Sequence, residues 1–415
     1  MTVTSTPTEP ECRSATAWVE ATLRSFAAYA VPVLAALLTL WALWLWPSEY
    51  PEESVRAPLP FQALTVDDER EPAQALQALT LQPSRTVWDT RLSEKPLWVL
   101  LTVPDSSLPD SPVLDFPSRH AVSMRCWNAD TLTLLGTFDR MATPTASGRL
   151  LPSRAGVVLA AEPLPARVLC EARFTGPAHF TAKLRQAGEV TALQQQFHRH
   201  AGWIDGGLLL LALFTLIAGF INRERTYLVF AAWLVINMRM AALSGGWDHQ
   251  WLGQLVPAEW LAPMRQITLA LYATVTVVLF RFLLDDDLRR TRTLAPVRWV
   301  LLACVPVLAA ALVLPYRQFL PLIWAATAIG VLVLGYALGV ILVRTRSTVA
   351  MWYAGSMAVT LLASLYEVIA AALGLRGLIG SFDSVTAALA SSLLASLAIA
   401  EQFRQEHLQR LALQA

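Results

Sequence analysis

Four ionisable side chains lie within or at the ends of strongly apolar segments of the sequence. Asp205 begins one such segment, Arg239 lies about one turn from the end of the next, and Arg265 begins the third. Glu367 lies about two turns inside the sixth. Ionisable groups are costly in a bilayer and usually face the protein interior, so each of them is a functional hypothesis. Their predicted positions place two acids and two bases at one level, near the outer end of a helical bundle.

Three aromatic side chains accompany this set, namely Tyr366, Trp247 and Trp251. Two interpretations are open. In the first, the charges form a structural ion-pair set whose arginine side chains reach the membrane interface. In the second, the charges line an outward-open pocket with aromatic walls, which binds a ligand or the loops of an outer domain.

A metal site can also be constructed near the outer membrane face, from His198 and His200 together with Asp248 and His249. Imidazole and carboxylate groups suit zinc. The alternative is a polar turn and a polar loop beside the membrane. The two elements meet only in an assumed fold, so we predict neither a metal nor another cofactor.

Two of the four cysteines, Cys126 and Cys170, fall on predicted strands of an extracytoplasmic segment. That compartment permits a disulfide. Two buried free thiols are the alternative, and the sequence does not decide between them because it does not give the distance between the Cα atoms. Cys12 and Cys304 fall in predicted cytoplasmic and intramembrane positions, so neither is expected to be bridged.

Motifs that would indicate catalysis are absent from the sequence. It has no P-loop, no dinucleotide-binding fingerprint, no zinc-protease pair, no nucleophile elbow and no kinase signature set. We therefore predict that this chain is not an enzyme. The net charge of +1 gives no case for a nucleic-acid partner.

The composition indicates which elements must position these residues. Hydrophobic residues make up 55% of the 415 residues and charged residues only 15%, whereas soluble domains have roughly 45–50% and about 25%. We therefore predict a multi-domain membrane protein with an uncleaved anchor at 27–46 and a bundle of seven transmembrane helices. The seven spans are predicted at 203–222, 226–243, 264–284, 296–314, 319–343, 348–373 and 382–402.

The arginines of the short loops indicate the orientation. Loops 221–226, 281–298 and 343–347 contain nine arginines, and the alternate loops contain three. Since basic loops stay in the cytoplasm, this asymmetry places both termini inside and residues 47–202 outside the cytoplasmic membrane.

Short apolar runs between turn signals predict an all-β sandwich over 47–185. A linker helix is predicted at 186–202, since Val190, Leu193 and Phe197 share one helical face. The predicted strands are 97–103, 121–127, 131–135, 156–160, 166–174 and 178–184.

Several of these segments resemble bacterial seven-transmembrane receptors with diverse intracellular signalling modules. The first helix enters through 202–207, a basic turn and aromatic restart follow at 222–230, and the third helix closes with Phe-Arg-Phe-Leu at 280–283. The outer segment is similar to that family's carbohydrate-binding-like sandwich at 98–103 and 167–174. The chain departs from the family in lacking a polar Asn in its first helix and in having an anchor before the outer domain.

The resemblance implies signal transduction at a bacterial inner membrane, with residues 47–202 in the periplasm. A carbohydrate-like or other small-molecule ligand would bind on the periplasmic side, and a cytoplasmic signalling domain or protein of the diguanylate cyclase or histidine kinase type would respond. Residues 1–26 would form a cytoplasmic tail, residues 203–402 the seven-helix domain, and residues 403–415 the start of a signalling helix. We therefore predict a transmembrane receptor in the lipid bilayer, with a homodimer as a candidate assembly. A membrane transporter or channel is the alternative, disfavoured because charges are lacking at mid-depth and the two halves show no repeat.

Overall fold

The computed structural model describes most of the β-rich and helical parts of the chain. The described residues are 34, 37, 58–67, 70–90, 93–104, 111–118, 120–140, 149–153, 156–175, 178–245, 248, 250–251, 254–373, 391–402 and 404. They divide into two compact units, of which one includes residues 47–279 and 298–332 and the other residues 280–297 and 333–415. The predicted anchor at 27–46, apart from Leu34 and Leu37 in helical conformation, and the predicted tail at 403–415, apart from Arg404, lie outside the described residues.

The N-terminal part of the first unit, which we call the β domain, contains two large antiparallel sheets. The larger sheet has six strands in the order β2-β1-β4-β10-β6-β7. Its strands are β1 (Phe61–Thr65), β2 (Ser84–Arg85), β4 (Leu97–Thr102), β6 (Ala121–Asn128), β7 (Leu134–Asp139) and β10 (Arg167–Phe174). Strands β6 and β10 are joined by a disulfide between Cys126 and Cys170, which lie opposite each other in the register.

The smaller sheet has four strands in the order β12-β5-β9-β8. Its strands are β5 (Pro112–Phe116), β8 (Leu150–Ser153), β9 (Gly156–Leu159) and β12 (Lys183–Gln186), and a separate pair is formed by β3 (Trp88–Asp89) and β11 (His179–Phe180). The ring of Phe180 lies 5.1 Å from that of Phe61 on the larger sheet and 5.7 Å from that of Phe116 on the smaller. The two sheets therefore share one aromatic and aliphatic core, in the manner of a sandwich.

A short helix, α2 (Pro72–Thr80), packs on the same β domain. Proline occupies its first turn, where a missing N–H is tolerated, and its Ala75 and Leu79 are fully buried at i and i+4. They belong to a cluster with Trp98 and Trp127, whose rings stack at 5.5 Å. Strand β4 is thus buried by the core on one face and by this cluster on the other, which explains its uninterrupted apolar run.

Two of the predicted strands differ from the observed ones. The strand predicted at 131–135 begins only at Leu134, because residues 128–132 form a turn in which Leu132 has a φ of 54° and the Asn128 side chain accepts a hydrogen bond from the N–H of Asp130. The run predicted at 178–184 is split between β11 and β12, which pair with different partners. Strands β1, β2, β3, β5 and β8 and helix α2 were not predicted.

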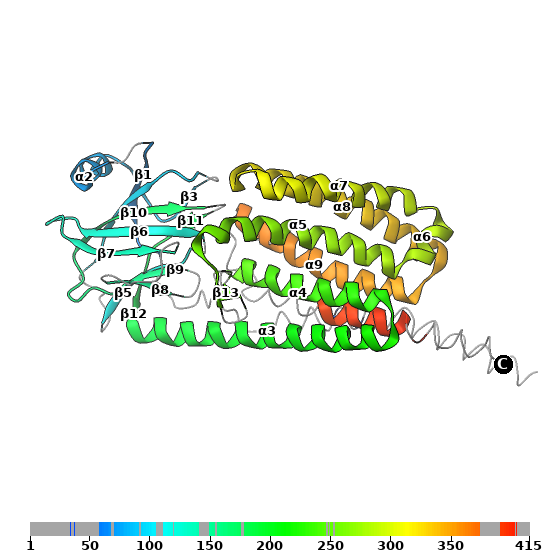
Figure 1. The fold of residues 1–415 in the computed structure, drawn as a ribbon. Coiled ribbons are helices and arrows are strands. Elements are labelled where there is room, and N and C mark those ends of the chain that lie inside the picture. The colour runs from blue at the N-terminus through cyan, green and yellow to red at the C-terminus, as the bar shows by residue number, and fades with distance from the viewer. Residues whose placement is uncertain are drawn as a thin grey trace, which may run out of the picture. The chain divides into compact units, whose positions relative to one another are not determined.

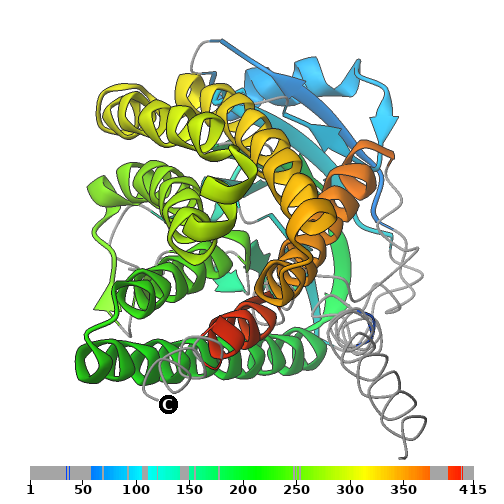
Figure 2. The ribbon, with the colours of Figure 1, turned by 90° about the vertical axis from the view of Figure 1, so that its right-hand side faces the viewer.

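The linker predicted at 186–202 and the first predicted span form one continuous helix, α3 (Ala187–Asn222). Figure 1 shows it starting beside β12, and Figures 1 and 2 both show α4 (Arg225–Gly245) running along it. The chain reverses at Arg223, which adopts a left-handed conformation with a φ of 54°. The two helices approach closely at Gly219, where an added Cβ atom would lie 2.9 Å from Leu228 and 3.0 Å from Tyr227.

Three further long helices follow a small hairpin of β13 (Gln250–Trp251) and β14 (Gln254–Leu255). They are α5 (Ala258–Leu283), α7 (Leu294–Val313) and α8 (Tyr316–Thr345). In the first unit they share a cluster that includes Ala270, Ala311 and Phe319. Among the described residues, α3, α4, α5, α7 and α8 are long and apolar enough to cross a membrane. Each coincides with a predicted span.

The second unit contains α6 (Asp285–Thr291), α9 (Thr348–Leu373) and a helix over 391–402. Helix α6 begins with three aspartates and ends with two arginines, an arrangement that suits the helix dipole. The Ser356 hydroxyl of α9 donates a hydrogen bond of 2.7 Å to the carbonyl of Ser391, which links α9 to the last helix. Helix α9 coincides with the span predicted at 348–373, and 391–402 with the described part of the span predicted at 382–402.

Candidate functional site

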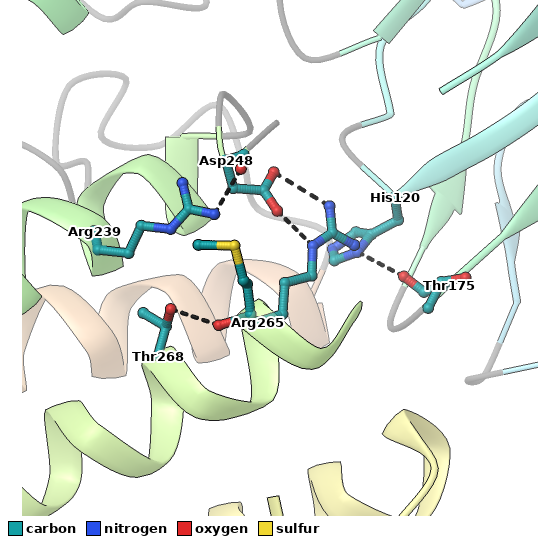
Figure 3. A network of polar contacts seen from close by, with 7 residues as sticks. His120, Thr175, Arg239, Asp248, Arg265 and Thr268 are labelled. Atoms are coloured by element: carbon teal, nitrogen blue, oxygen red, sulfur yellow. Dashed lines mark hydrogen bonds and ion pairs between the residues drawn. The ribbon is translucent and has the colours of Figure 1, made fainter. Parts of the chain in front are cut away.

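The carboxylate of Asp248 is the centre of a buried charged cluster in the connection between α4 and α5. Asp248 is only 1% exposed. The Arg265 side chain of α5 approaches it with two nitrogens, since its Nε donates to Oδ2 at 2.5 Å and its Nη2 to Oδ1 at 3.2 Å (Figure 3). This bidentate geometry is the strongest form of an arginine–carboxylate pair.

Arg239 of α4 reaches the same residue from the other side. Its Nη2 donates a hydrogen bond of 2.7 Å to the backbone carbonyl of Asp248, and its guanidinium lies 5.3 Å from the centre of the Trp251 ring. Both contacts suit a planar cation that stacks on an aromatic face and donates from its edge. One residue of the connection is therefore held by both flanking helices.

The β domain adds a further charge to this cluster through Arg140, the residue that follows β7. Its backbone N–H donates a hydrogen bond of 2.7 Å to the Val122 carbonyl, which fixes it to β6. Burial lowers the pKa of Arg140 to about 10; the Asp248 carboxylate opposes this shift and the Arg265 charge adds to it. Arg140 is therefore close enough to interact electrostatically with both residues. All of these residues belong to the first unit.

The electrostatic state of Asp248 follows from these neighbours. Burial on its own raises the pKa of the carboxyl group, because it penalises the charged form. The charge and hydrogen bonds of Arg265, together with the charges of Arg140 and Arg239, outweigh burial and leave the pKa below its usual value. Asp248 is accordingly ionised at neutral pH and binds the cations around it.

Figure 3 also draws His120 of the β domain, whose dashed line runs to Thr175. Its Nδ1 lies 3.1 Å from the carbonyl oxygen of Thr175, and because a carbonyl can only accept, Nδ1 carries the proton. On α5, the Thr268 hydroxyl donates a hydrogen bond of 2.6 Å to the Met264 carbonyl one turn earlier.

The structure brings together part of the predicted set. Arg239, Arg265 and Trp251 meet around Asp248, and the Asp205 charge interacts with that of Arg239. Trp247, as well as the side chains of Tyr366 and Glu367, lies outside the described residues.

Sequence reasoning considered Asp248 only as a metal ligand and missed Arg140. Where side chains are described, no group of three or more histidine, cysteine or acidic residues could hold a metal. The side chains of His200 and His249 are not among them. Asp248 lies in a short connection between two helices that each carry an arginine near that connection, and this pattern was a usable signal for it. No local pattern identifies Arg140.

A second buried charged cluster joins the smaller sheet to α3. Arg185 of β12 is 6% exposed and Asp115 of β5 is 2% exposed. The Nε of Arg185 lies 3.0 Å from Asp115 Oδ2, and its Nη1 lies 2.6 Å from Oε1 of Glu189, in the first turn of α3. An apolar contact of Val113, Val158 and Val190 accompanies these charges. The start of α3 is thus attached to the sheet by both ionic and apolar contacts.

The described side chains of both clusters are engaged in ion pairs and hydrogen bonds, which is the chemistry of attachment between elements. The fold and these clusters define a multi-pass membrane protein in which a β-rich domain precedes a helical region. Residues 200–402 match the family model described as 7TM diverse intracellular signalling. This part of the chain belongs to that family of seven-transmembrane receptors, as the resemblance predicted. No curated protein was found to match the chain.

Proposed function

We propose that this chain is the sensor part of a transmembrane receptor, in which the β domain binds an extracytoplasmic ligand and the helices convey the resulting change to a cytoplasmic output. The main support is the continuity of α3, which extends from the smaller sheet to the end of the first predicted span. Because a helix of 36 residues is about 54 Å long, it reaches well beyond a hydrocarbon core of roughly 30 Å. Membership of residues 200–402 in a receptor family is the second support.

The finer parts of this proposal extend the sequence analysis. The ligand is a carbohydrate-like or other small molecule, and the output is a diguanylate cyclase or histidine kinase type of domain or partner. The chain lies in a bacterial inner membrane with an anchor at 27–46, seven further spans and both termini in the cytoplasm, as the arginine asymmetry of its loops supports. Catalysis belongs to the output and not to this chain.

Such a receptor has one thermodynamic requirement. The ligand must bind one state of the protein more tightly than the other, since equal affinity for both shifts nothing. A binding site in the β domain meets this requirement only if the domain is attached firmly to the helices, and the two buried charged clusters supply such attachments.

The experiment is a thermal-shift screen of the full chain in nanodiscs against a panel of mono- and oligosaccharides and small metabolites. A ligand of the native state stabilises by about 2.7 kcal/mol at a concentration of 100 Kd, so a specific compound should raise Tm in a concentration-dependent way. Stereoisomers of each sugar are the matched control. If no compound raises Tm and proteoliposomes containing the chain instead take up a solute, the transporter alternative replaces the receptor.

A further inference from the structure

We infer that three turns between helices, each with two exposed arginines one residue apart, bind the phosphate of anionic phospholipid headgroups. The turns join α3 to α4, α6 to α7, and α8 to α9. We call them the arginine turns, and their arginines are Arg223 and Arg225, Arg290 and Arg292, and Arg344 and Arg346. The inference goes beyond the proposed receptor function, because it requires only that the helices cross a bilayer.

One arginine of each turn has a left-handed backbone conformation. The φ angles of Arg223, Arg292 and Arg346 are 54°, 61° and 52°. Helices commonly end on a residue in this conformation, but that residue is usually glycine, because a Cβ atom makes the conformation unfavourable. Glycine at these three positions would relieve backbone strain. The presence of arginine there is therefore explained by its side chain and not by the backbone.

The guanidinium groups of the arginine turns are available to an anion. All six arginines are exposed. Among the described residues, none of the six forms an ion pair or a side-chain hydrogen bond, whereas the neighbouring Arg289 pairs with Asp285 at 2.8 Å. A guanidinium has several N–H donors and matches a phosphate group with parallel hydrogen bonds. Two such groups in one turn can therefore bind one phosphate from two sides.

The side chains beside these arginines favour a lipid as the source of the phosphate. In α3, Phe220 and Ile221 are 68% and 76% exposed and lie within one turn of Arg223. In α8, Val343 is 80% exposed and directly precedes Arg344. Both helices are long and apolar enough to cross a membrane, so these apolar side chains face acyl chains. The adjoining guanidinium groups consequently lie at the level of the headgroups.

Stabilisation of the helix dipole is the structural alternative, and it does not account for the whole pattern. A cation is favourable at a helix C-terminus, which suits Arg290 and Arg344. Arg225, however, begins α4, where a cation is unfavourable. Glu224 lies between the arginines of the first turn, whereas residues 341–353 around the third contain no acid. We therefore expect the α8–α9 turn to bind an anionic headgroup most tightly.

The sites are counted by native mass spectrometry of the full chain in detergent with added phosphatidylglycerol, and phosphatidylcholine is the neutral comparison. The chain should retain phosphatidylglycerol in preference to phosphatidylcholine. The double variant Arg344→Gln with Arg346→Gln should lose one tightly bound lipid, because the affinity of that turn should fall by about fivefold for each arginine removed. Arg289→Gln is the matched control, since this exposed arginine is already paired, and it should lose none.

The variant Arg346→Gly separates lipid binding from a role in the backbone. Because glycine relieves the strained φ, the Tm of this variant in phosphatidylcholine nanodiscs should equal or exceed that of the unmodified chain. In nanodiscs with phosphatidylglycerol, the unmodified chain should gain more in Tm than the variant, since bound lipid stabilises the native state. A loss of Tm of equal size in both lipids would show a structural arginine and overturn the inference.

Soluble anions distinguish a lipid from other partners of the same chemistry. Glycerol phosphate and a polyglutamate peptide are added separately to the chain in phosphatidylcholine nanodiscs, and neither should raise Tm. If only the peptide raises Tm, and the double variant abolishes this effect, the turns dock an acidic protein. If glycerol phosphate acts as well as phosphatidylglycerol, the ligand is a soluble phosphate.

Either of these results would overturn the inference, as would equal retention of the two lipids. No extracytoplasmic ligand is used, so failure here leaves the receptor proposal standing. Failure of the sugar screen would in turn leave the lipid sites intact.

Discussion

The two buried charged clusters are assembled in opposite ways. In the cluster of Asp115, Arg185 and Glu189, which we call the sheet–helix clamp, one arginine pairs with two acids, and Arg185 and Glu189 are only four residues apart in the sequence. In the Asp248 cluster, one acid faces Arg140, Arg239 and Arg265, which come from a strand end and two helices. The pair of Arg185 with Glu189 is local and forms once β12 continues into α3, whereas the pair of Arg185 with Asp115 joins neighbouring strands. The Asp248 cluster exists only when distant parts of the first unit have come together, so it reports on the assembled fold.

The difference leads to unequal expectations for removing the central residue of each cluster. Asp248→Ala should have the largest effect, because it leaves buried guanidinium groups without the carboxylate that they surround. We expect the free energy of unfolding to fall by about 3–5 kcal/mol, measured by denaturant titration in detergent. Asp285→Ala, which breaks a pair between the partly exposed Asp285 and the exposed Arg289, should stay below about 1 kcal/mol. Equal losses in the two variants would show that Asp248 is not a central residue.

The clamp should follow with a somewhat smaller loss. Arg185→Ala leaves Asp115 buried without its guanidinium, whereas Glu189 is already partly exposed to water. We expect a loss of about 3 kcal/mol in the same titration. Arg167→Ala, in an exposed pair with Asp130, is the control and should change stability by about 0–1 kcal/mol. A control as damaging as Arg185→Ala would contradict the burial argument.

Two glycines of α3 extend the comparison to the packing of the same helix. Gly219→Ala should destabilise by about 1–2 kcal/mol, because the new methyl group meets Leu228 and Tyr227 within 3.0 Å. Gly202→Ala should stabilise by about 0.5–1 kcal/mol, because nothing lies within 4 Å of the added Cβ and alanine favours helix. Thermal unfolding of both variants measures the two changes in stability. A shift of Tm in the same direction for both would contradict this expectation.

The smallest effect on stability near neutral pH is expected from a change of pH, through the protonation of Asp248. The folded-state pKa of Asp248 lies below its unfolded value of 3.8, so its ionic stabilisation is complete above that value and is lost as the pH falls through the folded pKa. Unfolding at several pH values should therefore show a constant contribution of Asp248 between about pH 5 and 8 and a loss of that contribution in strong acid. Asp248→Asn should lack that acid-dependent component, while Asp285→Asn should retain it.

Strands whose burial produces an apolar run in the sequence were predicted. Strands whose burial depends on contacts between residues distant in the sequence were missed. Strands β4 and β10 were predicted because both are buried along most of their length and read as apolar runs. Strand β5 was missed because Asp115 interrupts its apolar residues and a proline begins it. The buried position of that aspartate is explained by its ion pair with Arg185, seventy residues away in sequence.

The candidate site shows the same limit. Arg239 and Arg265 were identified because an arginine near an apolar span is conspicuous. Asp248 lies in a polar connection where an aspartate is ordinary, and Arg140 follows a strand of the β domain. Their participation depends on how the β domain meets the α4–α5 connection, which no local pattern encodes.

Because α3 is continuous, the number of residues in it fixes the angle, about the helix axis, between the smaller sheet and the first span. Each residue of an α-helix contributes a turn of about 100° and a rise of about 1.5 Å. One residue inserted near Gly202 would thus swing the clamp by about 100° around the helix axis. An insertion of seven would restore the facing direction to within about 20° while raising the sheet by about 10 Å. The stretch of α3 outside the membrane therefore tolerates changes of residue type far better than changes of residue number, unless these come in multiples of a heptad.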